Sequence, residues 1–413
     1  MVEVIVNGRC YRAPERPTVV ICFDGCDPAY IERGIADGIL PTIAGFQRSG
    51  FYAIADAVVP TFTNPNNASI VTGAPPAVHG ISGNYYLDRA TGEEHMVTDG
   101  TLMRCGTILA ALADAGVKTA TVTAKDKLRL MLARGLKGIN FSSEHADRAT
   151  LQRNGIADVE AMVGRAKPEQ YSGDLSLYVL DAGLALLERK PATLLYLSLS
   201  DFIQHAHAPG TPEADAFNRA VDLRIARLVA AGAVVGVVAD HGMKDKSLPN
   251  GEPNVVYLEE ALARQFGEGA VRVICPITDP FVRHHGALGS FVRVYLRKAS
   301  DLASLMDASR RLPGVEEVLD GPTAARRFEL PADVEGDFVV LGDAATVIGS
   351  SRGEHDLSGL AGHRLRSHGG LGEQQVPFMV SRALRSEWLE VRRGRRLRNF
   401  DIFDAVLNGV VAS

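Results

Sequence analysis

Acidic and histidine side chains follow three short apolar runs of this sequence. Asp24 comes after VVICF, and Asp201 comes after LLYLSLS. A third run, VVGVVA, is followed by the pair Asp240 and His241. Such runs are typical of buried strands, and ligands bind where the carboxyl ends of the strands of an open parallel sheet meet. We therefore expect these side chains to converge, and carboxylates with imidazoles form metal sites.

Two further histidines can join this set. His205 lies four residues after Asp201, so both side chains share one face if a helix follows the strand. His368 precedes two glycines, which allow close approach of the backbone. Three carboxylates and three imidazoles are too many for one tetrahedral ion and suit two. Oxygen and nitrogen ligands without thiolate favour two Zn²⁺ ions over Mn²⁺ or Fe²⁺, and imidazoles disfavour calcium. A helix N-cap is the simpler interpretation of Asp24 or Asp201 taken alone.

A hydroxyl group lies near this set in the segment VVPTFTNPNNASIVTG. The segment leaves a strand, turns at Pro60 and Pro65, and enters a helix near Asn66. Thr63 therefore lies at or just before a helix N-terminus, which favours an anion. A metal-coordinated hydroxyl there can attack phosphorus. A threonine N-cap is the structural alternative, and Thr61 is the competing hydroxyl.

These motifs, in this order, resemble the alkaline phosphatase superfamily. The similarity rests on Asp24, PTFTNPNN, VTGAPPAVHGISGN, the Asp201 and His205 pair, ADHGM and SHGG. It is greatest to the nucleotide pyrophosphatase and phosphonoacetate hydrolase branches and covers most of the chain outside a central insertion. The resemblance implies two zinc ions, one held by Asp201, His205 and His368, and the other by Asp24, Thr63, Asp240 and His241.

The segment TVTAKDKLR bears on the choice of branch. It resembles the phosphonoacetate hydrolase pattern, in which two lysines hold the substrate carboxylate, here Lys125 and Lys127. A solvated charge cluster at a helix start is the alternative interpretation. By the same resemblance the Asn84 amide contacts an oxygen on phosphorus, although Gly83 and Asn84 are also typical of a turn.

The resemblance implies a hydrolase that cleaves the carbon–phosphorus bond of phosphonoacetate to acetate and phosphate. Thr63 would form a phosphothreonine, while Lys125 and Lys127 hold the carboxylate onto which the charge of the leaving carbanion spreads. The enzymatic alternative is a phosphodiesterase or nucleotide pyrophosphatase on the same metal core, with a nucleotide slot to which Phe62, Tyr85 or Tyr86 could contribute. A non-catalytic phosphonate-binding protein is a third hypothesis, which the presence of a nucleophile disfavours.

Composition and charge limit the partners. The chain has 413 residues, 46% hydrophobic content and a formal net charge of −5, with no basic stripe that would indicate nucleic acid. No apolar run reaches the length of about 18 residues that a membrane span needs. Five cysteines without C-x-x-C spacing, and no signal-like start, predict a cytoplasmic protein. We expect a small anionic substrate, and a homodimer is an oligomeric state that the chain allows.

Strand and helix patterns alternate along the chain, which predicts an α/β fold with a doubly wound, mainly parallel sheet. Asp27 and Pro28 should open one helix, because proline favours the first helical position. The other expected elements are strands at 18–23, 51–59, 117–123, 194–200 and 234–239, and helices at 105–116, 174–190 and 212–232.

Between Met243 and His368 the pattern changes to short β-rich pieces with two helical stretches. We expect a smaller α+β cap domain over the active face, inserted into the metal-binding core. The predicted boundaries are 1–250 and 366–413 for the core and 251–365 for the cap.

Several residues stay undecided at this point. His207 is expected to pack or lie at the surface, and His79 to organise its loop. A cationic cluster in the cap could reach over the cleft; it comprises Arg283, His284 and His285.

Overall fold

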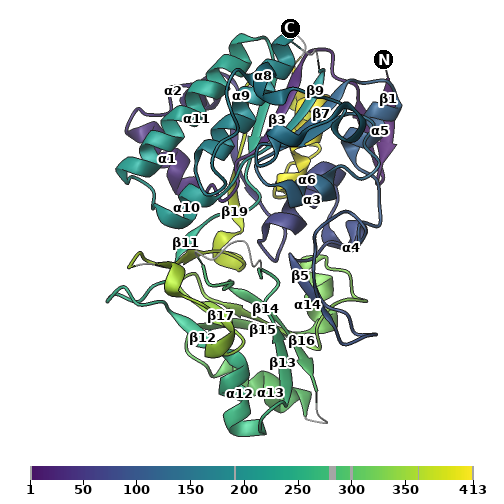
Figure 1. The fold of residues 1–413 in the computed structure, drawn as a ribbon. Coiled ribbons are helices and arrows are strands. Elements are labelled where there is room, and N and C mark those ends of the chain that lie inside the picture. Colours follow the sequence, from purple (N-terminus) through teal and green to yellow (C-terminus); the bar gives the residue numbers. More distant parts are fainter. Residues whose placement is uncertain (1, 190–191, 279–284, 298–300, 361, 412–413) are drawn as a thin grey trace.

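The computed structural model describes residues 2–189, 192–278, 285–297, 301–360 and 362–411 (Figure 1). A seven-stranded sheet forms the centre of the larger part, in the order β4-β19-β10-β3-β9-β7-β8. The strands are β3 (Thr18–Cys22), β4 (Phe51–Asp56), β7 (Thr119–Thr123), β8 (Ile139–Ser142), β9 (Leu194–Ser198), β10 (Val234–Val238) and β19 (Gln375–Val380).

Most strands of this sheet run parallel, as predicted. β10, β3, β9, β7 and β8 form parallel pairs in turn, whereas β19 pairs antiparallel with both β10 and β4. Every residue of β3, β9 and β10 is buried. Continuous apolar runs are needed because both faces of a parallel sheet are covered by helices.

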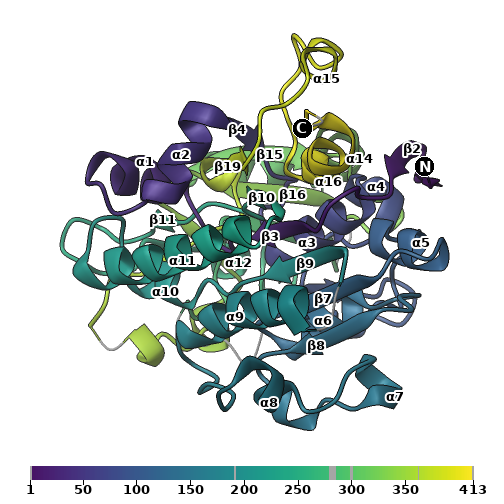
Figure 2. The ribbon, with the colours of Figure 1, turned by 90° about the horizontal axis from the view of Figure 1, so that it is seen from above.

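Helices cover the two faces of the sheet (Figure 2). α9 (Asp174–Arg189) and α11 (Pro212–Ala230) lie on one side, and α5 (Ile108–Asp114) and α16 (Ile402–Asp404) on the other. The side chain of Asp27 caps α1 (Pro28–Ala36) by accepting from the N–H of Ala29, which confirms the predicted start. The other helices of the larger part are α2 (Pro41–Ser49), α3 (Thr63–Thr72), α4 (Pro76–His79), α6 (Asp126–Leu132), α7 (Leu151–Asn154), α8 (Val159–Val163), α10 (Phe202–Ala206) and α15 (Ser386–Glu390).

A second, antiparallel sheet of four strands lies below the first part in Figure 1. It has its own hydrophobic cluster, which includes Phe291 and Phe338. The α+β content expected of the cap is therefore present, while the predicted boundaries stay a prediction. Its elements are β13 (Val271–Ile274), β14 (Phe291–Leu296), β15 (Val315–Asp320), β16 (Phe338–Gly342), α12 (Leu258–Phe266), α13 (Leu302–Arg310) and α14 (Gly321–Phe328).

Two-stranded ribbons complete the chain. The strands β11 and β18 pair antiparallel where the chain passes between the two parts and back. The ribbon strands are β1 (Glu3–Val6), β2 (Arg9–Arg12), β5 (Tyr85–Leu87), β6 (Glu94–Met96), β11 (Lys244–Asp245), β12 (Val255–Tyr257), β17 (Val347–Gly349) and β18 (Arg366–Ser367).

The loop that carries Asn84 is tied to the smaller part. The N–H of Asn84 donates to Pro276 O at 2.7 Å. The buried guanidinium of Arg293 forms two hydrogen bonds to Glu335, at 2.6 and 3.1 Å, and a third to Ser82 O at 3.1 Å. A buried ion pair of this kind demands a fixed geometry, so the smaller part helps to position Asn84.

Within the described ranges, no helix is both long and apolar enough to cross a bilayer. The five cysteines are all free thiols, and three of them are buried.

Candidate active site

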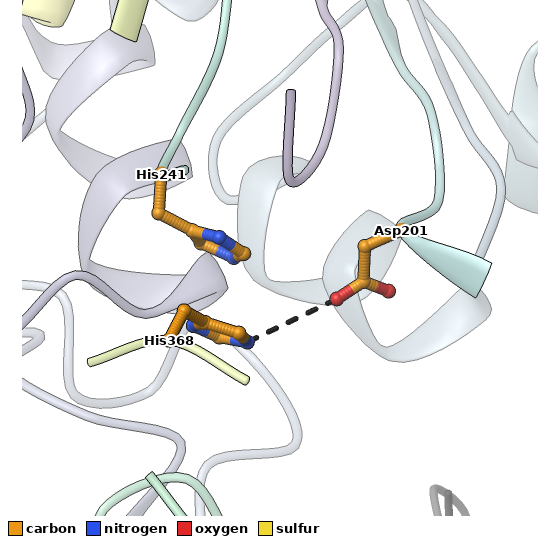
Figure 3. A group of neighbouring side chains, drawn as sticks. All are labelled: Asp201, His241 and His368. Carbon is orange, nitrogen blue, oxygen red and sulfur yellow. Dashed lines mark ion pairs between the residues drawn. The ribbon is translucent and has the colours of Figure 1, made fainter. Parts of the chain in front are cut away.

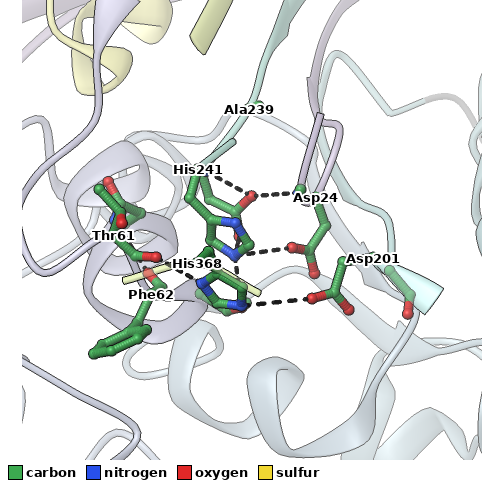
Figure 4. A network of polar contacts seen from close by, with 12 residues as sticks. Asp24, Thr61, Phe62, Asp201, Ala239, His241 and His368 are labelled. Carbon is green, nitrogen blue, oxygen red and sulfur yellow. Dashed lines mark hydrogen bonds and ion pairs between the residues drawn. The ribbon is translucent and has the colours of Figure 1, made fainter. Parts of the chain in front are cut away.

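The predicted acidic and histidine residues meet beyond the carboxyl ends of the central strands (Figure 4). Asp24 follows β3, Asp240 and His241 follow β10, and Asp201 follows β9 as the residue before α10. His205 lies on α10, and His368 follows β18. All six side chains are buried, as the metal-site prediction requires.

One group of ligand atoms comprises Asp24, Asp240 and His241, whose atoms lie within 4.8 Å of one another. His241 Nε2 is 3.4 Å from Asp24 Oδ1 and 3.7 Å from Asp240 Oδ2. Asp240 Oδ1 accepts from the N–H groups of Gly25 and His241. Asp24 Oδ1 is buried and accepts no hydrogen bond within the described part of the chain. A buried acceptor without a donor is costly unless a cation offsets it.

A second group comprises Asp201, His241 and His368 (Figure 3). His368 Nε2 is 3.9 Å from Asp201 Oδ2, and the ring of His368 stacks on that of His241 with centroids 3.6 Å apart. His205 Nε2 is 2.9 Å from Asp201 Oδ2. His241 therefore lies between the two groups, and His205 adjoins the second.

Backbone carbonyl groups orient all three imidazoles. The Nδ1 atoms of His205, His241 and His368 lie 2.7 to 2.9 Å from the carbonyl oxygens of Arg366, Gly242 and Thr61, respectively. A carbonyl can only accept, so each Nδ1 carries a hydrogen, and Nε2 is the ring atom that can offer a lone pair to a metal ion. This tautomer is the one that binds metal ions through Nε2. The donor set of carboxylate oxygens and Nε2 atoms fits zinc.

Burial and mutual repulsion dominate the electrostatics of the three carboxylates. Burial, together with the charges of Asp201 and Asp240, raises the pKa of Asp24 well above its usual range. Burial also raises the pKa of Asp240 to about 7. For Asp201, burial acts in the same direction, but Lys125 and His205 outweigh it and hold the pKa well below normal. A cation among these groups would favour their ionised forms.

Thr63 is the first residue of α3 and faces the first group. Its Oγ1 lies 3.3 Å from His241 Nε2, which accepts the hydroxyl hydrogen because Nδ1 is protonated. The competing hydroxyl of Thr61 is fully buried; it donates to Gly370 O and accepts from Gly369 N. Thr61 therefore holds the loop after His368 through hydrogen bonds, and Thr63 is the hydroxyl that faces the acidic and histidine side chains.

A cavity of about 460 Å³ opens beside these groups. Lys125, Lys127 and Asn84 line it together with Asp24, Thr63, Asp201 and His368. Lys125 Nζ lies 3.3 Å from Asp201 Oδ1. Asn84 Oδ1 accepts from the N–H of Asn64 at 3.2 Å, which ties this amide to the start of α3. Every substrate residue predicted from the sequence thus lines this cavity.

Some side chains near the cavity had no assigned role. His285 is buried, lines the cavity, and lies with its ring 5.1 Å from that of His205. Burial, with His205 nearby, lowers the pKa of His285 to about 3, so its ring is neutral. Arg283 and His284 lie outside the described residues. His207 lies away from the cluster, beside Glu213.

His79 organises its loop, as expected. It is buried, and its Nδ1 accepts from the N–H of Ile81 at 3.1 Å. Its Nε2 must then donate to Ser69 Oγ, 2.8 Å away. Because this imidazole donates to the hydroxyl, it cannot act as a base toward Ser69. The contact is structural.

Comparisons with known proteins agree with this geometry. Residues 18–357 match the family described as type I phosphodiesterase / nucleotide pyrophosphatase. The chain belongs to this family. A solved structure of phosphonoacetate hydrolase from Sinorhizobium meliloti 1021 in complex with phosphonoformate is 45% identical, with a TM-score of 0.94 over 99% of each chain. The structure of that enzyme in complex with phosphonoacetate is 44% identical, with a TM-score of 0.93.

Two other similarities are limited in the length matched or in sequence identity. Phosphonoacetate hydrolase from Penicillium oxalicum is 69% identical over 29 residues, which are 7% of this chain and 40% of that protein. Murine ectonucleotide pyrophosphatase / phosphodiesterase 5 is 16% identical with a TM-score of 0.63, which shows the fold alone. The predicted alkaline phosphatase-like α/β fold, the similarity to phosphonoacetate hydrolase and the hydrolase class are confirmed.

Proposed function

We propose that this chain is a di-zinc hydrolase that cleaves the carbon–phosphorus bond of phosphonoacetate to acetate and phosphate. The observation that carries the proposal is one cavity bordered by a hydroxyl, two lysines and the two acid–histidine groups. Similarity at 45% identity over 99% of the chain to a phosphonoacetate hydrolase supports the substrate.

The metal ligands are assigned by the donor atoms that face each other. Asp24, Asp240 and His241, with Thr63 Oγ1, would hold one zinc ion. Asp201, His205 and His368 would hold the other, because His205 Nε2 and His368 Nε2 both face Asp201 Oδ2. When bound, two zinc ions would supply Lewis-acid stabilisation of the oxygens on phosphorus and would lower the pKa of a hydroxyl or water.

The residues of the chain then account for the first half of the reaction. Thr63 Oγ1 gives its proton to water and attacks phosphorus; the new O–P bond forms as the C–P bond breaks. The electron pair of that bond passes to carbon and spreads onto the carboxylate, giving an acetate enolate that takes a proton from water. Lys125 and Lys127 would hold this carboxylate, so their ammonium groups would lie where negative charge develops in the transition state. Asn84 would donate to an oxygen on phosphorus.

In the second half, water attacks the phosphothreonine and breaks its P–O bond. Phosphate leaves, and the Thr63 hydroxyl is restored. Fixing the nucleophile and both charged ends of a small substrate in one cleft reduces the entropic part of the barrier.

The cellular setting belongs to the same proposal. We infer a small anionic substrate, which the lysines that line the cavity support. A cytoplasmic location is supported by five free thiols, which suit a reducing compartment. A homodimer is the proposed assembly.

Acid quenching during turnover tests the phosphothreonine. The zinc-loaded protein is mixed with phosphonoacetate, quenched and digested, and the peptide that contains Thr61 and Thr63 is analysed by mass spectrometry. We expect phosphate on Thr63 in the wild type, phosphoserine in Thr63→Ser, and no phosphopeptide in Thr63→Ala. Phosphate on Thr61 would contradict the proposal. A Thr63→Ala protein that still forms products and carries no phosphopeptide would also contradict it.

A further inference from the structure

Asn67 joins the nucleophile to one of the metal-binding groups. It lies on α3, one turn after Thr63, and its side chain is fully buried. Its Nδ2 donates to Thr63 O at 3.1 Å and to Asp240 Oδ2 at 3.1 Å. Its Oδ1 accepts from Tyr196 OH at 2.7 Å and from Ser198 Oγ at 3.0 Å, both on β9. These four hydrogen bonds use the full capacity of the amide.

The orientation of this amide is determined by its partners. A carbonyl oxygen such as Thr63 O only accepts, so the NH₂ end must face Thr63 and Asp240. The two hydroxyls of β9 then donate to the oxygen end. A reversed amide would place its oxygen against the Thr63 carbonyl and the Asp240 carboxylate and lose the hydrogen bonds to both, so this orientation is the favoured one.

The neighbouring Asn66 has a different role. It is also fully buried, but its amide bonds the backbone of Val58, Pro60 and Phe62 and the side chain of Asn399. It therefore fixes the turn before α3. Of these two asparagines, Asn67 is the one whose side chain contacts both Thr63 and a metal-binding carboxylate.

We propose that Asn67 is a positioning residue, which holds the Thr63 end of α3 and the Asp240 carboxylate at a fixed separation. Thr63 Oγ1 and Asp240 both face His241, so the same amide sets two of the groups assigned to one zinc ion. Partners that hydrogen-bond to metal ligands typically contribute about 10- to 100-fold to metal affinity or activity. This inference rests on the proposed function for its kinetic part, but not for its metal-binding part.

The test compares Asn67→Ala with Asn154→Ala. Asn154 is a buried asparagine whose amide donates to Asn140 O and accepts from Thr150 N, on α7 outside the cavity lining. Each protein is titrated with zinc against a chelator to resolve the two binding steps. Thermal unfolding, kcat and KM for phosphonoacetate are measured on the same samples.

We expect Asn67→Ala to weaken one zinc-binding step about 10- to 100-fold and to leave the other unchanged. We expect kcat to fall by a similar factor while KM stays near the wild-type value, because Lys125 and Lys127 are intact. Asn154→Ala should lose stability without changing either zinc step or kcat. An Asn67→Ala protein that behaves like Asn154→Ala would overturn the proposal.

A milder variant covers the case in which Asn67→Ala does not fold. The double variant Tyr196→Phe, Ser198→Ala removes the hydroxyls that hold the amide and leaves Asn67 in place. It should weaken the same single zinc step and lower kcat, by a smaller factor. Unchanged zinc binding and kcat in this folded double variant would overturn the proposal. A wild type that binds two zinc ions but does not cleave phosphonoacetate refutes the proposed function and leaves the zinc test of Asn67 valid.

Discussion

Replacing Asp24 by asparagine should stabilise the metal-free protein and reduce its stabilisation by zinc. Burial, and then the charges of Asp201 and Asp240, raise the pKa of Asp24 well above its usual value. The folded protein therefore keeps a proton on Asp24 that the unfolded chain releases above about pH 4. The free energy of unfolding then falls as pH rises between these two pKa values. Asparagine does not titrate, so the Asp24→Asn protein escapes this loss.

The size of the effect follows from proton linkage. One proton corresponds to about 1.4 kcal/mol of unfolding free energy per pH unit. The buried histidines His79, His285 and His368 act in the opposite direction, because their lowered pKa values make stability rise with pH up to about 6.5. They are present in both proteins and cancel in the difference. From pH 5 to pH 7, Asp24→Asn should therefore gain stability relative to the wild type, by at most about 1.4 kcal/mol for each pH unit over which the folded wild type keeps this proton.

Urea unfolding of chelator-treated proteins across this pH range measures the difference in unfolding free energy between Asp24→Asn and the wild type. A repeat with zinc tests the predicted reduction in stabilisation by zinc. Zinc should stabilise Asp24→Asn less than the wild type, because a carboxamide is a poorer ligand for the zinc ion assigned to Asp24, Asp240 and His241, while Asp201, His205 and His368 are unchanged. Asp222→Asn is the matched control. Asp222 is also buried, but it accepts the N–H groups of Thr42 and Ile43 at the start of α2.

The control should lose stability at every pH and still respond to zinc. The reasoning is refuted if the relative stability of Asp24→Asn does not rise with pH. It is refuted equally if zinc stabilises that variant as much as the wild type.

Three further outcomes follow from the site and the cap. Lys127→Ala should lower kcat/KM for phosphonoacetate about 100-fold and spare a nitrophenyl phosphodiester, whose leaving group carries no carboxylate. Lys125→Ala should affect both substrates, because Lys125 also contacts Asp201, a proposed zinc ligand. Equal losses on both substrates in Lys127→Ala would contradict the carboxylate role. Thr63→Ala should bind phosphonoacetate in calorimetry and release no acetate, and any remaining turnover would exclude the threonine as nucleophile. Arg293→Met should lower the free energy of unfolding by about 3 to 5 kcal/mol, because it leaves the buried Glu335 unpaired; a loss below about 1 kcal/mol in urea unfolding would show that this pair is not critical.

The sheet and the convergence of most of the acidic and histidine side chains could be predicted from the sequence because their signals are local. Buried strands such as β3 and β10 consist almost entirely of apolar residues, and an acidic residue follows each of them after one further apolar residue. The four-residue spacing of Asp201 and His205 predicted their proximity, and α10 provides it.

The antiparallel strand β19 was not predicted, and this has a physical reason. Its direction depends on pairing with β10 and β4, which are distant in sequence. An apolar run of five residues such as VPFMV in β19 indicates burial but carries no information about its direction.

The orientation of the imidazoles could not be predicted either. The carbonyl groups that hold His205 and His368 belong to Arg366 and Thr61, which lie 161 and 307 residues away in the chain. No periodicity or spacing reports such contacts. The choice between Thr61 and Thr63 was left to resemblance for the same reason, because it depends on which hydroxyl bonds the loop after His368.

The measurement that tests the central claim most directly is the release of acetate and phosphate from phosphonoacetate. The purified, zinc-loaded protein is assayed beside a chelator-treated sample and beside a nitrophenyl phosphodiester. We predict that acetate and phosphate appear in equal amounts, that the chelator abolishes both, and that zinc restores them. Cleavage of the diester with no products from phosphonoacetate would contradict the claim.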